Sequence, residues 1–318
     1  MTTSPVRIGI SSCLLGDEVR FDGGHKRDRF LTGTLGPFVE WVRVCPEVEV
    51  GMGIPRETLR LVKVGDDTRM ITTRTAVDHT DSMRAFAARR TRELMTLDLR
   101  GYVLKKDSPS CGMERVKVYE AGGGTPDRTG VGIYAAVLQQ RFPSLPIEEE
   151  GRLQDPILRE NFIERVFAYD RLRELFDRRW SVKDVIAFHT AHKMALLAHS
   201  TTAYQELGRL VAGAKSLPRA ELRRRYEDLF MRTLKRPATR ARHTNVLAHM
   251  AGHLKTLVDA ESRRELADCI EQYRRDLVPL IVPLTLLRHH VRSRGVGYLA
   301  GQTYLDPHPR ELMLRNHV

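Results

Sequence analysis

Short apolar runs alternate with amphipathic stretches over the first half of the chain. Compact runs rich in β-branched and aromatic residues predict strands at residues 6–12 (VRIGISS), 41–47 (WVRVCPE) and 101–107 (GYVLKKD). Over residues 79–99 apolar positions recur at helical spacing, which predicts a helix. Strands that alternate with helices indicate βαβ units, so we expect a Rossmann-like α/β domain with a mostly parallel sheet.

Two other segments of this half carry local signals. Residues 59–73 (LRLVKVGDDTRMITT) predict a small hairpin around a Gly-Asp-Asp turn. A glycine-rich segment at 122–132 predicts a loop, and GIYAAVLQQRF after it predicts a further helix.

The pattern changes after Asp155, where apolar residues repeat every three or four positions. The stretches with this repeat are 161–176, 182–199, 221–234, 242–258 and 263–291. They predict an all-α domain. A charged stretch with glycine and proline, EEEGRLQDP at 148–156, precedes them. We therefore expect two domains, 1–150 and 151–318.

Composition limits the class of protein. The 318 residues are 42% hydrophobic, and no run approaches 18 apolar residues, so we expect no membrane span. The first residues, MTTSPVRIGI, lack the basic and apolar regions of a secretory signal, and we expect a cytoplasmic protein. Four cysteines in such a chain argue against a disulfide framework and favour reduced thiols, metal ligands or core residues.

The formal charge of +12 is unevenly distributed. Residues 1–150 hold 22 Lys and Arg against 21 Asp and Glu, whereas 151–318 hold 30 against 19. Such a field attracts polyanions, of which nucleic acid is the commonest, although a basic solvated helical surface would give the same count. Residues 219–242 are the most basic, with Tyr226 and Phe230 interleaved. The candidate phosphate contacts there are Arg219, Arg223, Arg224, Lys235, Arg236, Arg240 and Arg242.

Three of the cysteines stand alone at the ends of the predicted strands. They are Cys13 in ISSCLLG, Cys45 in VRVCPE and Cys111 in DSPSCGM. Ligands of open α/β sheets bind beyond the carboxyl ends of the strands, where these thiols would meet. Zinc sites pair their ligands as CxxC or HxxxH, and none of these three cysteines is paired in this way, whereas thiolate-rich sites favour iron–sulfur clusters. Three unrelated buried cysteines would show the same spacing. Cys269, in the middle of a predicted helix, is expected to be a core residue.

Polar groups accompany two of these cysteines. Glu47 follows Cys45 by two positions, and Ser108 and Ser110 precede Cys111. A carboxylate beside a metal can act as a general base, and a hydroxyl can donate to a developing anion. An exposed turn carboxylate and ordinary turn-capping serines are the alternatives.

Four motifs in order, SSCLLG, VRFDGGHK (19–26), CPE with GMGIPRE, and DSPSCG, resemble the thiouracil desulfidase (TudS-like) family over residues 5–150. The second half resembles the YbgA-like domain that is often fused to it, through FHTAHKMALLAHS, NVLAHMAGHLK, VPLIVPLTLLRHH and QTYLDPHPRELMLRN. GMGIPRE differs mildly from the usual glycine-proline wording of the family at that point.

The resemblance implies a [4Fe-4S] cluster held by Cys13, Cys45 and Cys111, with one iron free of protein ligands. It also implies non-redox removal of sulfur from a thiolated pyrimidine, with Glu47 and Ser108 as catalytic residues and Ser110 as the alternative serine. Members fused to the helical domain resemble desulfidases of 4-thiouridine in tRNA, which makes thiolated tRNA the expected partner. Two alternatives stay open: a desulfidase of free thiouracil or other small thiolated bases, and a non-catalytic RNA-binding iron–sulfur sensor.

Overall fold

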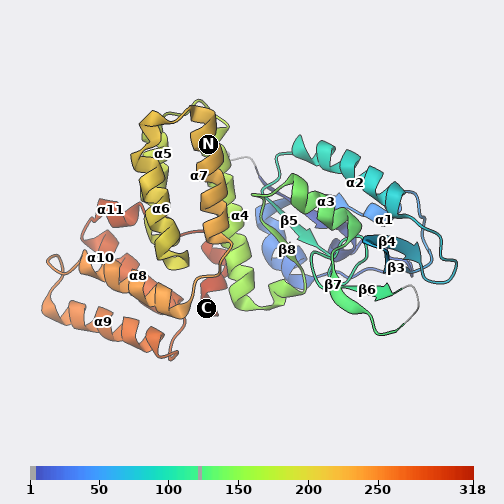
Figure 1. Ribbon diagram of the computed structural model, residues 1–318. Coiled ribbons are helices and arrows are strands. Elements are labelled where there is room, and N and C mark those ends of the chain that lie inside the picture. The colour runs from blue at the N-terminus through green and yellow to red at the C-terminus, as the bar shows by residue number, and fades with distance from the viewer. Residues whose placement is uncertain (1–4, 121–123) are drawn as a thin grey trace. The chain divides into compact units, whose positions relative to one another are not determined.

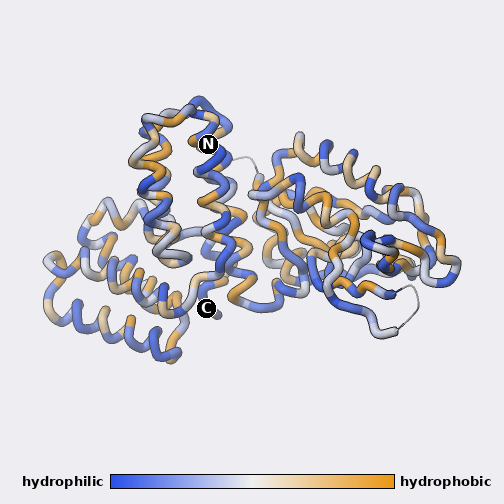
Figure 2. The backbone as a smooth tube through the Cα atoms, viewed as in Figure 1, coloured by the Kyte–Doolittle hydropathy of each residue, from blue (hydrophilic) through white to orange (hydrophobic). Residues whose placement is uncertain are grey.

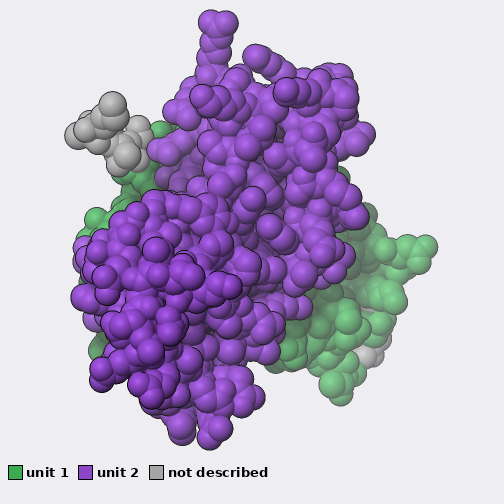
Figure 3. Space-filling model, turned by 90° about the vertical axis from the view of Figure 1, so that its left-hand side faces the viewer, with its two compact units in different colours: residues 1–154 green, residues 155–318 purple. Residues whose placement is uncertain are grey.

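The computed structural model describes residues 5–120 and 124–318, and the chain forms two compact units (Figures 1 and 3). The first unit ends at Gln154 and the second begins at Asp155. No helix of the described segments is long and apolar enough to cross a membrane.

A sheet of four strands, all parallel, forms the centre of the first unit. Its order is β2–β1–β5–β8, made of β1 (Val6–Ser11), β2 (Val39–Val44), β5 (Gly101–Leu104) and β8 (Ile147–Glu149). In the register of β1, Ile8 lies opposite Trp41 on β2 and Gly101 on β5. The side chains of Ile8 and Ile10, which share one face of this central strand, are fully buried. The predicted parallel α/β arrangement is confirmed.

Two helices pack against each other and cover this sheet, α2 (Thr80–Met95) and α3 (Ile133–Arg141) (Figure 1). The phenol oxygens of Tyr102 on β5 and Tyr134 on α3 are 3.0 Å apart inside the core. The ring of Tyr102 also lies on Gly9, where a Cβ would come within 2.2 Å of it. Glycine is therefore required at this position of β1.

A second, mixed sheet has the order β4–β3–β6–β7. It consists of β3 (Leu59–Val64), β4 (Asp67–Thr72), β6 (Val116–Glu120) and β7 (Asp127–Gly130). The antiparallel β3–β4 pair confirms the predicted hairpin, and β6 runs parallel to β3. The prediction of a loop over 122–132 is wrong for Asp127–Gly130, which pairs with β6 as an edge strand. Residues 122 and 123 of that predicted loop lie outside the described residues.

The second unit is helical, which confirms the all-α prediction. Its helices are α4 (Pro156–Phe176), α5 (Val182–His199), α6 (Thr201–Ala212), α7 (Arg219–Leu234), α8 (Arg240–Gly252), α9 (Ala260–Arg274), α10 (Ile281–Ser293) and α11 (Gly297–Ala300). Figure 2 shows hydrophobic and hydrophilic positions alternating along α8 and α9. The single run predicted over 263–291 is divided between α9 and α10, where Asp276 adopts a left-handed φ of 65°. Helix α6 was not predicted.

Candidate functional site

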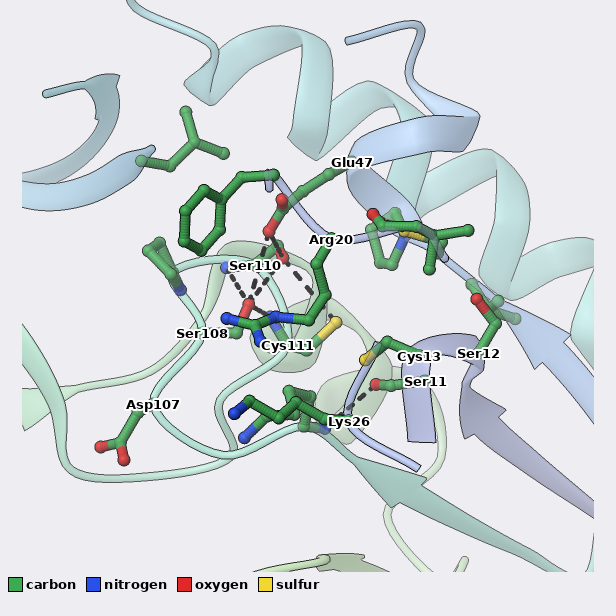
Figure 4. Close-up of a pocket in the computed structure, with 18 of the residues that line it drawn as sticks. Ser11, Ser12, Cys13, Arg20, Lys26, Glu47, Asp107, Ser108, Ser110 and Cys111 are labelled. Atoms are coloured by element: carbon green, nitrogen blue, oxygen red, sulfur yellow. Dashed lines mark hydrogen bonds between the residues drawn. The ribbon is translucent and has the colours of Figure 1, made fainter. Parts of the chain in front are cut away.

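Three parallel strands bring the three isolated cysteines to one cavity. Cys13 lies in the 3-10 turn Ser12–Leu15 after β1, Cys45 follows β2, and Cys111 lies in the loop after β5. These strands are neighbours, so their carboxyl ends share one edge of the sheet. The three cysteines line a cavity of 330 Å³, and Figure 4 shows the sulfurs of Cys13 and Cys111 directed into it.

The cavity thiols are free, and burial governs their ionisation. Cys13 and Cys111 are 8% and 5% exposed, and all four cysteines of the chain lack a disulfide partner. Burial, with a smaller contribution from Cys45, raises the pKa of the Cys13 thiol to about 12. Burial likewise raises the pKa of Cys111 and of Cys45. A coordinating metal reverses this preference, because the thiolate is the form that binds it.

Three thiols are donors of the kind that iron–sulfur clusters use. Within residues 5–120 and 124–318, no group of three or more His, Cys, Asp or Glu side chains is arranged to hold a single metal ion. A four-iron cluster spreads its ligands over several metal atoms, and its ligands are thiolates. Three thiols around a cavity of 330 Å³ are consistent with a group of that kind. Cys269 lies on α9 in the other unit and does not line this cavity.

Glu47 lies in the same cavity on the four-residue helix α1 (Pro46–Glu49). Its Oε2 accepts hydrogen bonds from Nε and Nη2 of Arg56, at 2.9 and 2.5 Å. Its Oε1 accepts one from the Ser110 hydroxyl at 2.7 Å, and the Ser108 hydroxyl is 3.5 Å away. The side chains of Arg56 and Glu47 are 7% and 15% exposed. The carboxylate is therefore held from both sides and is not an exposed turn residue.

The first turn of α3 fixes the serine-containing loop. The amides of Ile133 and Ala135 donate to the carbonyls of Pro109 and Ser110, at 3.0 and 3.1 Å. A Cβ on Gly132 would come within 2.4 Å of the Ser110 carbonyl oxygen, so this approach requires glycine. Within the loop, the Ser108 hydroxyl accepts a hydrogen bond from the Cys111 amide at 3.1 Å. It also lies 2.9 Å from the Ser110 hydroxyl. The Ser110 hydroxyl instead lies 3.7 Å from the Cys111 sulfur, so the two serines contact Cys111 differently, which their spacing in the sequence did not show.

The segment VRFDGGHK provides the cationic and aromatic edge of the cavity. Arg20, Phe21 and Lys26 all line it, and the guanidinium of Arg20 lies 5.2 Å from the centre of the Phe21 ring. The Lys26 amide donates to the Cys13 carbonyl at 2.9 Å, which ties this segment to the cysteine turn. Phe21 is 37% exposed. The sequence marked this segment as a motif but gave no reason to place it, or Arg56, beside the thiols.

In the second unit, the structure divides the predicted phosphate contacts into paired and free side chains. Arg223, Arg224 and Arg240 form ion pairs with Asp177, Glu221 and Asp276 respectively, and Arg242 donates to the carbonyl of His199. Lys235 and Arg236, at the end of α7, are exposed, and their side chains have no partner among the described residues. Arg219 lies over the Trp180 ring at 5.7 Å.

The interleaved aromatic residues of this stretch are not available to nucleic acid. Tyr226 and Phe230 are fully buried and stack on each other, with ring centres 5.8 Å apart. The interpretation of these two rings as part of a surface that binds RNA is wrong. The two residues are four positions apart in the sequence, so they lie on the same face of α7, and this face is buried.

Comparison with known proteins separates the same two segments. Residues 8–150 match the family model described as 2-thiouracil desulfurase, and residues 193–309 match a family described as a protein of unknown function, DUF1722. The chain is 31% identical to the uncharacterized protein YbgA of Escherichia coli (strain K12) over 153 residues, 48% of this chain and 90% of YbgA. It is 30% identical to the uncharacterized protein YbbK of Bacillus subtilis (strain 168) over 136 residues, 41% of this chain and 88% of YbbK.

A solved structure described as a [4Fe-4S]-dependent thiouracil desulfidase, TudS, is 28% identical, with a TM-score of 0.38, over 47% of this chain and 93% of that one. The parallel sheet and the residues that line the thiol cavity lie within the part of the chain that matches the 2-thiouracil desulfurase model, which is a class of enzymes. The chain belongs to the 2-thiouracil desulfurase family in its first half, joined to a YbgA-like DUF1722 domain in its second. Desulfuration of a thiouracil-type base is accordingly its chemistry.

Proposed function

We propose that this enzyme converts 4-thiouridine in tRNA to uridine, using a [4Fe-4S] cluster held by Cys13, Cys45 and Cys111. The proposal rests on the residues that line one cavity. Three thiols, an ion-paired carboxylate and two serine hydroxyls line the same 330 Å³ space. This set supports replacement of sulfur by the oxygen of water on a small planar ring.

The reaction balances without electron transfer. Water supplies the oxygen of the new C=O bond, the C=S bond breaks, and sulfur leaves as hydrosulfide. When bound, the cluster would supply a Lewis-acidic iron suited to a soft thiocarbonyl sulfur. A general base must remove a proton from the attacking water, and a proton must return as the sulfur leaves.

Glu47 is the base in this proposal. Arg56 holds Oε2 in a paired geometry, and Ser110 holds Oε1 at 2.7 Å, so the carboxylate has one orientation in the cavity. Ser108 is the hydroxyl that donates to the substrate, and Ser110 connects it to Glu47 through contacts of 2.9 and 2.7 Å. A proton accepted by the carboxylate can therefore be passed back along the two serines.

A polynucleotide substrate is supported by features of each unit taken separately. Phe21 and Arg20 give the cavity edge a surface on which an unstacked base can lie, and Lys26 adds a cation for a phosphate. The second unit carries the excess positive charge of the chain, and Lys235 and Arg236 are exposed there. Thiolated tRNA is thus the proposed partner, and the cytoplasm, where tRNA is used, the proposed location.

Release of sulfide under anaerobic conditions tests the proposal. The cluster-loaded chain is incubated with tRNA containing 4-thiouridine and, separately, with free 2-thiouracil. We expect sulfide and uridine in equal amounts from the tRNA, with a higher kcat/KM than for the free base. Faster turnover of the free base would favour a small-molecule desulfidase. Binding of tRNA without any sulfide would favour a non-catalytic sensor.

A further inference from the structure

A second cavity adjoins the thiol-lined one within the first unit. It has a volume of 560 Å³. The two cavities share Thr58, Leu59, Asp107 and Pro109 in their walls. A substrate that is longer than one base and that occupies the first cavity would therefore reach the second directly.

Basic and aromatic side chains of β3, β6 and β7 line this second cavity. Its wall includes Arg60, Lys117, Tyr119 and Arg128. Val62 lies opposite Tyr119 in the parallel register. Because side chains alternate along a strand, Arg60 and Lys117, each two positions earlier, share the face of Tyr119.

These basic side chains form few or weak interactions with other residues of the protein. The Nε of Arg60 is buried without a hydrogen-bond acceptor, and Lys117 is exposed without an ion pair, both judged over the described residues. Arg128 is 3.5 Å from Asp107, but both side chains are more than half exposed, so water screens this pair. One acidic residue thus stands against three basic ones, which favours an anionic ligand.

The guanidinium of Arg60 also lies 5.7 Å from the centre of the Tyr119 ring. Guanidinium planes and tyrosine rings are the surfaces on which proteins stack unpaired bases, and basic side chains beside them hold phosphates. We infer that this cavity, the flanking-nucleotide groove, binds the nucleotide next to the thiolated one in a single-stranded polyribonucleotide. The inference rests on the proposed function and adds a second binding site to it.

Small substrates and polynucleotides should differ in whether they contact the groove. A free base or a mononucleotide fills only the thiol-lined cavity, whereas a polynucleotide also occupies the groove. Loss of a groove cation should therefore weaken the longer substrate alone. Each phosphate contact removed should lower the salt slope of binding by about 0.7, as expected for a single strand.

The test compares Lys117→Gln and Arg60→Gln with a control in the full cluster-loaded chain. Lys117 is exposed, so its variant is expected to fold even if the half-buried Arg60 proves necessary for structure. Lys63→Gln is the control, since Lys63 is an exposed residue of β3 on the opposite face from Arg60. The substrates are 4-thiouridine 5′-monophosphate and a short uridine oligonucleotide with one central 4-thiouridine.

We expect each groove variant to raise KM for the oligonucleotide about tenfold, which corresponds to about 1.4 kcal/mol, with KM for the monophosphate unchanged. The control should change neither. An equal rise in KM for both substrates, or an unchanged KM for the oligonucleotide, would contradict the proposed role of the groove. Binding of a fluorescent unthiolated uridine oligonucleotide gives a second readout that needs no turnover. If the variants weaken that binding while no sulfide is ever released, the proposed function fails and the groove stands.

Discussion

Arg56 and Glu47 form a nearly buried ion pair in which two guanidinium nitrogens contact one carboxylate oxygen. The same guanidinium donates to the Gly53 carbonyl at 3.1 Å, so its own position is fixed by the backbone. Glu47 is left with one oxygen directed to Ser110 and the cavity. In the proposed mechanism, Arg56 would therefore act on the reaction through the orientation of Glu47.

Arg56→Lys should lower kcat about 10²-fold while KM and iron content stay near their wild-type values. Lysine keeps the charge but loses the planar, paired contact, and a small displacement of a catalytic group has a cost of that size. Steady-state kinetics measure the effect. Arg43→Lys is a matched control, because Arg43 pairs with Asp17 at the surface, 2.5 Å away. A wild-type kcat in Arg56→Lys would remove the orienting role.

Glu47→Gln should retain the cluster and lose activity by about 10²–10⁴-fold, the usual contribution of a general base. The amide cannot accept the proton from water. Iron content and sulfide release are measured on the same sample. Glu40→Gln is the control, since Glu40 is a half-exposed carboxylate of β2 that pairs with Arg7 and does not line the cavity. Normal turnover in Glu47→Gln would reject Glu47 as the base.

The two serines should respond differently to removal of their hydroxyls. Ser110→Ala should lower kcat about tenfold with full iron content, since it loses a bond of typical net strength to Glu47. Ser108→Ala should lower both kcat and iron retention, because its hydroxyl also accepts from the amide of Cys111. Iron assays and kinetics on both variants distinguish them. Full iron content in Ser108→Ala would show that this turn does not depend on its hydroxyl.

The second unit should lose stability as the pH falls below about 6.5. Burial, and then Arg171, lower the pKa of His192 to about 3, so the folded state binds fewer protons than the unfolded state between these values. Its ring accepts from Arg171 at Nε2 and contacts the Phe188 carbonyl at Nδ1, which fits the neutral form. One such histidine contributes a slope of about 1.4 kcal/mol per pH unit.

His192→Gln should reduce this slope, measured as the free energy of unfolding of the full chain at pH 7 and pH 5. His317→Gln, an exposed histidine of the same unit, should leave it unchanged. An unaltered slope in His192→Gln would mean that another group carries the acid sensitivity.

The sequence predicted the elements that have a clear local pattern of apolar and turn residues. The β1, β2 and β5 strands and the β3–β4 hairpin lie where compact apolar runs and turn residues predicted them. Edge strand β7 was missed because Asp127–Gly130 is rich in turn formers and depends on its partner β6 for its conformation. The charged stretch at 148–156 is predicted to mark the domain boundary, yet the side chains of Glu148, Glu149 and Glu150 are buried. Their burial depends on distant partners such as the Lys105 side chain and the Met113 amide.

Strand ends predicted which side chains would meet at the cavity, because the carboxyl ends of neighbouring parallel strands share an edge. Arg56 and Phe21 lie in irregular segments, whose course depends on tertiary contacts, so no period could place them there. Tyr226 illustrates a different limit of the sequence prediction. The helical period predicted the helix, but it could not predict that the face with Tyr226 is the buried one.

The central claim is that three separate thiols hold one cluster, and iron content per chain tests it most directly. The three variants Cys13→Ser, Cys45→Ser and Cys111→Ser are purified anaerobically beside Cys269→Ser, whose thiol lies on α9. We predict about four irons per chain for wild type and Cys269→Ser, and loss of most iron and of the visible chromophore in each of the other three. Full iron content in any of those three would contradict the account.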